Sequence, residues 1–175
     1  MPRPCLPLLL LLTACAGHQP PPPSDAAFAG VQSRGVVVMG VSQSTSRHVF
    51  EDLPDGGRII YVMVDAGDSA GAAMIRQHLT HITRQFAAGD FSDPMRVHAM
   101  TVPGTEVMAA RRAMIRYAMQ ERAGGGEVRI TTTDPEALAA VRQFLAFQRS
   151  DHRAPGADSA PAMDPDHARH HPGRR

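Results

Sequence analysis

The chain of 175 residues contains no lysine, and all 18 of its basic residues are therefore arginine. The 17 acidic residues leave a formal net charge of only +1 at pH 7. A nucleic-acid-binding domain normally carries a basic patch or stripe, which this balance does not indicate. We therefore expect no nucleic acid among the partners of this protein.

Long hydrophobic runs are also missing. The apolar segment at residues 6–12 is too short to cross a bilayer, and no later segment is apolar for long enough. Arg3 precedes this segment, and Leu12-Thr13-Ala14-Cys15 follows it. A positive start, a short apolar run and small residues before a cysteine resemble a bacterial lipoprotein signal with its lipobox. The alternative is an ordinary secretory signal followed by a chance cysteine.

The lipoprotein resemblance implies that residues 1–14 are a signal peptide and that Cys15 becomes the lipidated amino terminus. Cys5 lies inside the signal, so no thiol remains for a disulfide or a nucleophile. We expect a protein of the bacterial cell envelope that faces the periplasm and binds the membrane through its lipid anchor. Ala16 stands where some lipoproteins carry an inner-membrane aspartate, and this favours the outer membrane.

Removal of the signal leaves about 160 residues, of which roughly 115 are suited to folding, enough for one domain. Residues 15–34, with prolines at 20–23, are predicted to form a lipidated, extended tether. Residues 154–175 are rich in His, Pro and Arg and are predicted to be a disordered tail. Residues 35–153 are predicted to form a single α+β domain that begins with a short strand at 36–41.

The domain contains a possible repeat of two hairpin-helix units, at residues 48–88 and 114–150. In the first, strands at 48–53 and 58–64 flank the turn Pro54-Asp55-Gly56-Gly57. In the second, strands at 114–121 and 127–133 flank Gly124-Gly125-Gly126. Two unrelated hairpins with common turn chemistry are the alternative.

A helix is predicted after each hairpin. Asp68 or Ser69 caps the first, and Asp134 followed by Pro135 begins the second. Each helix has one apolar stripe, formed by Ile75, Leu79, Ile82 and Phe86 in the first and by Leu138, Val141 and Leu145 in the second. The two ββα units predict an antiparallel sheet of four or more strands with both helices on one face.

The segment between the two units is harder to interpret. Residues 107–113 favour a short helix that gives way to a strand near Met114. Residues 89–104 carry two turn signals around a short apolar-polar alternation. This connector is either a loop that carries a site or a structured crossover with Phe91 in the core.

Several segments together resemble a family of small, uncharacterised, often exported bacterial proteins, some of which carry the label aspartate carbamoyltransferase. The segments are His48-Val49-Phe50, Asp55-Gly56-Gly57, Ile75-Arg76-Gln77-His78-Leu79, Gly89-Asp90-Phe91-Ser92-Asp93-Pro94, Val97-His98, and the helix from Asp134-Pro135 to His152. A carbamoyltransferase-like enzyme would require two α/β domains and a Ser-Thr-Arg-Thr loop at a helix start. This chain has Ser44-Thr45-Ser46-Arg47 before a predicted strand and room for one domain, so this activity is the least favoured alternative.

No common catalytic pattern is present, since the chain lacks Gly-x-Ser-x-Gly, His-Glu-x-x-His, a phosphate-binding loop and a free thiol. We therefore expect a non-enzymatic binding or interaction module on the envelope. Its partner would be an unknown envelope protein that pairs with a sheet edge or an open sheet face. Phe147, opposite the apolar stripe of its helix, is predicted to be an exposed docking point.

The alternative function is copper or zinc binding through His and Met residues. Met74, His78 and His81 follow one another along a second stripe of the first predicted helix, and His48, His98 and Met100 are further candidates. Imidazole and thioether donors suit copper, especially the reduced ion. Against this, Met is a common core filler and His beside an apolar stripe is often partly buried packing.

Lipid attachment at Cys15 has a direct test. We expect metabolic labelling with a radioactive fatty acid to mark the wild-type protein in a bacterial host and to leave the Cys15→Ser variant unlabelled, because the thiol is the acceptor. Equal labelling of the two proteins would exclude Cys15 as the attachment point.

Overall fold

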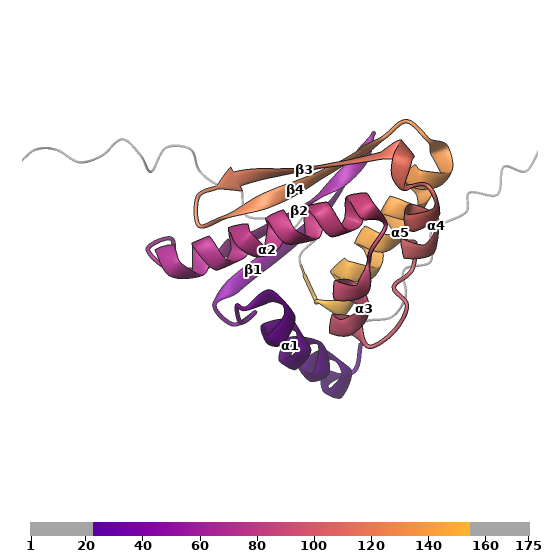
Figure 1. Cartoon of the computed structure of the whole chain (residues 1–175). Coiled ribbons are helices and arrows are strands. Elements are labelled where there is room, and N and C mark those ends of the chain that lie inside the picture. The colour runs from indigo at the N-terminus through magenta and orange to yellow at the C-terminus, as the bar shows by residue number, and fades with distance from the viewer. Residues whose placement is uncertain (1–22, 155–175) are drawn as a thin grey trace, which may run out of the picture.

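The computed structural model describes residues 23–154 (Figure 1). The predicted signal peptide, Cys15 and the predicted tail from residue 155 onward lie outside the described residues. The elements are α1 (Asp25–Met39), β1 (Ser46–Leu53), β2 (Gly56–Met63), α2 (Ser69–Ala88), α3 (Ser92–His98), α4 (Thr105–Ala110), the short 3-10 helix η1 (Arg112–Met114), β3 (Ile115–Arg122), β4 (Gly125–Thr132) and α5 (Pro135–Asp151).

The four strands form one antiparallel sheet in the order β1-β2-β4-β3, and α2 and α5 pack on the same face of it (Figure 1). Two glycines let the helices approach the strands closely. A Cβ at Gly57 would lie 2.2 Å from Leu145 of α5, and one at Gly126 would lie 3.0 Å from Leu79 of α2. The prediction of an α+β fold with both helices on one sheet face is confirmed.

The two ββα units are equal in their strand lengths and spacing. β1 and β3 begin at Ser46 and Ile115, and β2 and β4 at Gly56 and Gly125, so equivalent strand residues lie 69 positions apart. Ile59 and its equivalent Val128 pair with each other in the sheet. An approximate two-fold axis therefore passes between β2 and β4 and relates the two hairpins.

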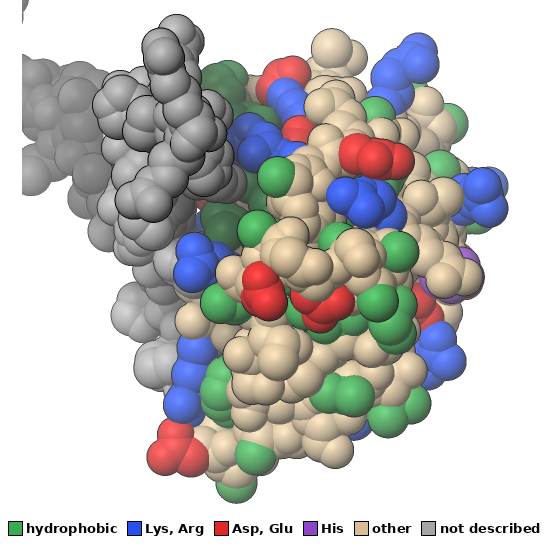
Figure 2. Space-filling view, turned by 90° about the vertical axis from the view of Figure 1, so that its left-hand side faces the viewer, with side chains coloured by type: hydrophobic (Ala, Val, Ile, Leu, Met, Phe, Trp, Pro, Cys, Tyr) green, Lys and Arg blue, Asp and Glu red, His purple; other side chains and the backbone are tan. Residues whose placement is uncertain are grey.

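The helix-facing side of the sheet forms the core, and the other side carries ion pairs. Ile75 and Leu79 of α2, and Val141 and Leu145 of α5, are at most 1 % exposed, as their predicted stripes require. On the opposite side, Arg122 contacts Glu127 at 2.5 Å and Glu51 pairs with Arg58. Charges of both signs also lie next to one another on the face of the molecule seen in Figure 2.

α1 corrects two predictions made from the sequence. Residues 36–41 do not form a strand, and residues 25–34 are not an extended tether, because Asp25–Met39 is helical. The Ser24 hydroxyl accepts from the Ala27 amide at one end, and Gly40 ends the helix in a left-handed conformation at φ 76°. α1 packs on α3, where Arg34 Nε donates to the Val97 carbonyl oxygen (2.7 Å). This tertiary packing outweighs the β propensity of the valine run.

The connector contains helices in place of the expected alternation. α3 and α4 lie between the two units, and Phe91 at the start of α3 is 5 % exposed. Phe91 stacks on Phe86 of α2 with ring centroids 4.6 Å apart. The connector is thus the structured crossover with a core phenylalanine, and a short helical segment precedes β3 as predicted.

Gly104 brings the backbone of the connector close to the backbone of α5. Its φ is +85°, and a Cβ there would lie 2.2 Å from the Ala140 carbonyl oxygen. We expect Gly104→Ala to lower the free energy of unfolding by about 2–4 kcal/mol, since both the left-handed backbone and the contact oppose a side chain. Urea denaturation measures the loss.

Gly30→Ala is the matched control for this substitution. Gly30 lies inside α1, and its added Cβ would lie 2.9 Å from Nη1 of Arg34, the far end of the side chain whose Nε donates to the Val97 carbonyl oxygen. The higher helix propensity of alanine offsets a small shift of this side chain, so the free energy of unfolding should change by no more than about 1 kcal/mol in either direction. Equal losses from the two substitutions would contradict the account of Gly104.

Candidate functional site

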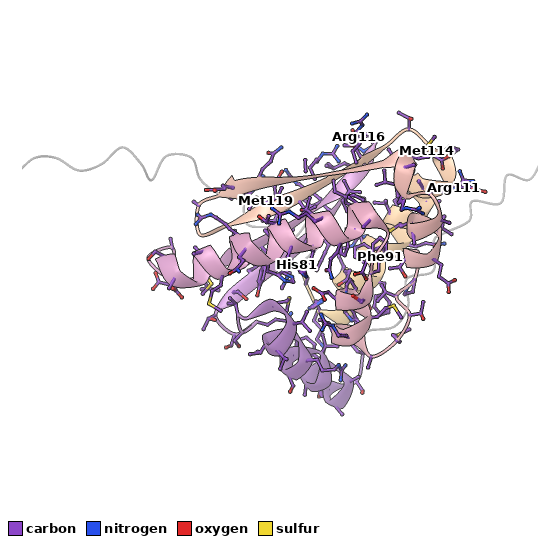
Figure 3. The ribbon with its side chains drawn as sticks, in the orientation of Figure 1. His81, Phe91, Arg111, Met114, Arg116 and Met119 are labelled. Carbon is purple, nitrogen blue, oxygen red and sulfur yellow. The ribbon has the colours of Figure 1, made fainter. Side chains whose placement is uncertain are left out.

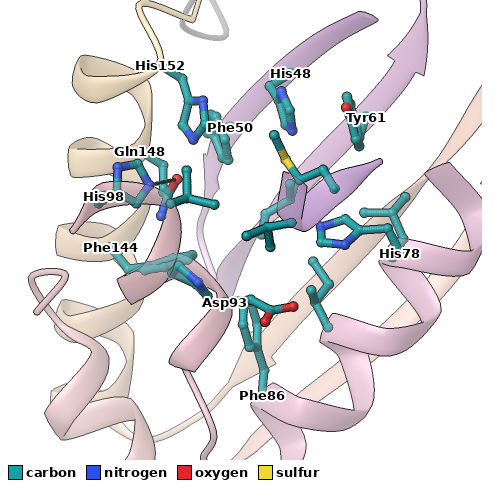
Figure 4. Close-up of a pocket in the computed structure, with 17 residues that line it drawn as sticks. His48, Phe50, Tyr61, His78, Phe86, Asp93, His98, Phe144, Gln148 and His152 are labelled. Carbon is teal, nitrogen blue, oxygen red and sulfur yellow. Dashed lines mark hydrogen bonds between the residues drawn. The ribbon is translucent and has the colours of Figure 1, made fainter. Parts of the chain in front are cut away.

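α2 and α5 touch each other through Phe86 and Phe144, whose rings meet edge to face with centroids 5.9 Å apart. Away from this contact the two helices separate across β1 and β2 (Figure 4). Helix α3 and the last residues of α1 fill part of the gap between them. The remaining space is a cavity of about 60 Å³. The wall of this cavity is mainly apolar and includes the four histidines His48, His78, His98 and His152. We call this space the histidine cavity.

His48 of β1 lies in the middle of an aromatic stack. Its ring lies 3.8 Å from that of Tyr61 and 5.1 Å from that of His152, with Phe50 further along at 5.6 Å. The residue is 8 % exposed, and its Nδ1 is buried without a hydrogen-bond partner. A buried polar atom without a partner is uncommon in folded proteins, and among the residues that line the cavity His48 has one.

Tyr61 of β2 forms the floor beneath His48. Its hydroxyl donates to the Val41 carbonyl oxygen (3.3 Å) and accepts from the Ser46 hydroxyl (3.2 Å). Burial raises the pKa of Tyr61, so the hydroxyl keeps its proton. His78 of α2 approaches the Tyr61 ring edge on at 6.5 Å and lies on the wall opposite His152 (Figure 4). Tyr61 therefore packs against both imidazoles.

The wall formed by α3 and α5 is held by hydrogen bonds. His98, the last residue of α3, donates through Nε2 to the Gln148 side-chain oxygen (3.0 Å) and pairs through Nδ1 with the Asp151 carboxylate. His152 caps the end of α5 and accepts at Nδ1 from the Gln43 side-chain amide (2.8 Å). Both nitrogens of His98 are thus occupied by protein groups, whereas His48 Nδ1 has none.

Burial makes most of these imidazoles very weak bases. It lowers the pKa of His48 to about 3, with smaller contributions from His78 and His98. Burial also lowers the pKa of His78 to about 4, where the Asp93 carboxylate opposes it in part. The pKa of His152 is well below its ordinary value for the same reason. Three imidazoles at the cavity are therefore unprotonated at neutral pH.

The structure divides the candidate residues that the sequence suggested. His48, His78 and His98 meet at the cavity. His81 is on the surface side of α2, where its Nε2 lies 3.5 Å from the Asp93 carboxylate (Figure 3). Met74 is 45 % exposed on α2, outside the cavity, and Met100 is 49 % exposed beyond α3. The three residues of the predicted stripe, Met74, His78 and His81, all line one groove on the outside of α2, and His78 reaches the cavity as well.

Phe147 was expected to be an exposed docking point, and this is wrong. It is half-buried against the core, and its ring meets His98 edge on at 5.1 Å. The His98 ring lies between Phe147 and His152. Phe147 therefore packs against His98 of the cavity wall without lining the cavity itself.

Within residues 23–154, no group of three or more His, Cys, Asp or Glu side chains is arranged to hold a metal ion. His78 and His81, whose spacing on one helix would let them share one ion, both line the groove between α1 and α2, and His78 also lines the cavity. Copper or zinc binding stays a prediction that the described part of the chain does not strengthen.

Sequence reasoning missed Tyr61, Asp93, Gln148 and His152 as site residues. These residues come from three elements, β2, α3 and α5 with its end, and meet only through the separation of α2 and α5. A comparison of the two repeat units gives one sequence signal for the position of the cavity. The residue equivalent to His48, 69 positions later, is Tyr117, so a histidine replaces an aromatic residue at one of two matched positions.

No family model, curated protein or solved structure matches this chain. The likeness to small exported bacterial proteins stays a prediction. Among the described residues, no helix has both the length and the hydrophobicity that crossing a membrane requires.

The buried histidines predict a dependence of stability on pH. An unfolded histidine titrates near pH 6.5, while folded His48 and His78 titrate at about 3 and about 4. The unfolded chain therefore binds more protons below pH 6.5, and stability falls as the pH drops from 6.5 toward 4. We expect each such histidine to lower the free energy of unfolding by about 1.4 kcal/mol per pH unit in this range.

Urea denaturation between pH 7.5 and 5 measures this slope. His48→Phe should reduce the slope by about 1.4 kcal/mol per pH unit, because it removes one of the groups that titrate only after unfolding. The difference between the slopes, and not the stability of the variant at one pH, is the readout. An identical slope in the two proteins would contradict the burial of a neutral His48.

Proposed function

We propose that this protein is a non-enzymatic binding protein that accepts a small, neutral ligand in the histidine cavity. The observation that carries the proposal is His48, a buried, unprotonated imidazole without a hydrogen bond at Nδ1, on the wall of a mostly apolar cavity. Ligand sites commonly combine an apolar wall with a few polar groups that fix the orientation of the ligand. The cavity has this composition.

The charges around the cavity favour a neutral ligand. The unprotonated imidazoles of His48 and His78 offer no positive charge to an anion. The buried Asp93 carboxylate, also on the wall, is paired with Arg96, so it offers no positive charge to an anion either. A cation would gain little from a carboxylate that has its own partner. A hydroxyl group, which both donates and accepts hydrogen bonds, suits an imidazole wall best.

The lipid anchor expected at Cys15 would place this site near a membrane. The Ser24 cap of α1 follows Cys15 by nine positions, and an extended chain of that length spans at most about 30 Å. The domain would thus collect its ligand close to the envelope surface. An envelope protein that exchanges ligand with the domain is the partner that this arrangement implies.

A titration with butan-1-ol, followed by NMR, tests the proposal. The probe is neutral, carries one hydroxyl group and is a small molecule, as a cavity of about 60 Å³ requires. We expect saturable shifts of the His48 ring and the Met39 methyl resonances, since both residues line the cavity. The His48→Phe variant should lose the saturable response of Met39, because the substitution removes the polar group and adds bulk.

The methyl group of Met114 is the internal control. Met114 is 53 % exposed and distant from the lining of the cavity. Shifts of Met39 and Met114 that grow together without saturation would represent a general solvent effect and would overturn the proposal.

A further inference from the structure

A groove of about 320 Å³ runs along the outside of the molecule between the end of α1 and α2. Val37 is 85 % exposed and Met74 is 45 % exposed on its apolar walls. Gln77 and His81 add polar groups on the α2 side. Gly40, in the left-handed conformation, lets the Met74 methyl group lie close to the end of α1, 2.9 Å from where a Cβ would be.

The groove and the histidine cavity share walls. Val38, Met39 and His78 line both of them, so the two spaces lie on either side of the same three side chains. Val38 is only half-buried, and Met39 is an unbranched side chain with adaptable rotamers. Joining the cavity to the groove requires a shift of these two side chains.

We propose that the ligand is a neutral single-chain amphiphile whose hydroxyl end lies in the histidine cavity and whose alkyl chain lies in the groove between α1 and α2. This inference rests on the proposed function and adds the chemical class of the ligand. The cavity alone holds only a small group, whereas cavity and groove together accommodate a longer molecule. An alkyl chain would cover Val37 and Met74, which otherwise remain in contact with water.

The charges at the shared wall distinguish this class from a fatty acid. A carboxylate head would lie beside unprotonated His48 and His78 and near the Asp93 carboxylate. Desolvation of a carboxylate without a positive partner is unfavourable. Decanoate should therefore bind more weakly than decan-1-ol at neutral pH.

Calorimetric titration with a series of linear alcohols from butan-1-ol to decan-1-ol tests the inference on the intact protein. Each methylene group that enters the groove should raise the affinity about fourfold, until the chain is longer than the groove and the affinity levels off. Met74→Glu, which puts a charge on the groove wall, should flatten the dependence on chain length while the affinity for butan-1-ol stays within about twofold.

Met100→Glu is the matched control, because Met100 is exposed to a similar degree, 49 %, and does not line the groove. This variant should keep the wild-type dependence on chain length. Affinity that does not change from butan-1-ol to decan-1-ol would overturn this inference and leave the proposed function intact. Equal effects of the two Met substitutions would also overturn it. Failure of every alcohol to bind, including butan-1-ol, would instead overturn the proposed function.

Discussion

The separation of α2 and α5 across one sheet is the constraint on which the rest of the structure depends. The two helices meet at the edge-to-face contact of Phe86 and Phe144 and then diverge over β1 and β2. Protein interiors are close-packed, so a gap between two diverging helices must be filled by other elements. α3 and the end of α1 supply that filling, and the space that they leave is the histidine cavity.

The chemistry of the cavity follows from this geometry. Because the gap lies above the sheet, the imidazoles of β1, α2 and α5 are removed from water and remain unprotonated. Gln43, Gln148 and Asp151 provide partners for His152 and His98. His48 receives aromatic neighbours but no partner at Nδ1, which costs about 1–3 kcal/mol relative to a paired group. Proteins commonly accept such a cost at functional sites, and this is why we place ligand recognition at His48.

Much of the fold could be predicted from the sequence because its signals are local. Turn glycines, the Asp134 cap and the apolar stripe through Ile75 and Leu79 specify hairpins and helices with little help from distant residues. α1 could not be predicted in this way. Its valines favour a strand when considered alone, and the helix forms through its contacts with α3, which residues far along the chain provide.

The site was predictable only in part, for the same reason. His48, His78 and His98 could be selected as chemically capable, but the expectation of a metal stripe followed one helix, whereas the site gathers residues from several elements. His152 lies just beyond the second unit as predicted, and only the tertiary structure brings it 5.1 Å from His48. Comparison of the two units was the more informative signal, since His48 and Tyr117 occupy equivalent strand positions. Tyr117 packs on Phe86 in the core, while His48 borders a cavity.

The most direct test of this account is an NMR titration of the His48 imidazole with pH in the folded protein. The account predicts that the ring stays neutral throughout the mildly acidic range, because burial lowers the pKa of His48 to about 3. At the least, it predicts no protonation of His48 above pH 5. A midpoint near 6.5, the ordinary value for histidine, would show that water reaches the ring and would contradict a buried, unprotonated imidazole at the centre of the site.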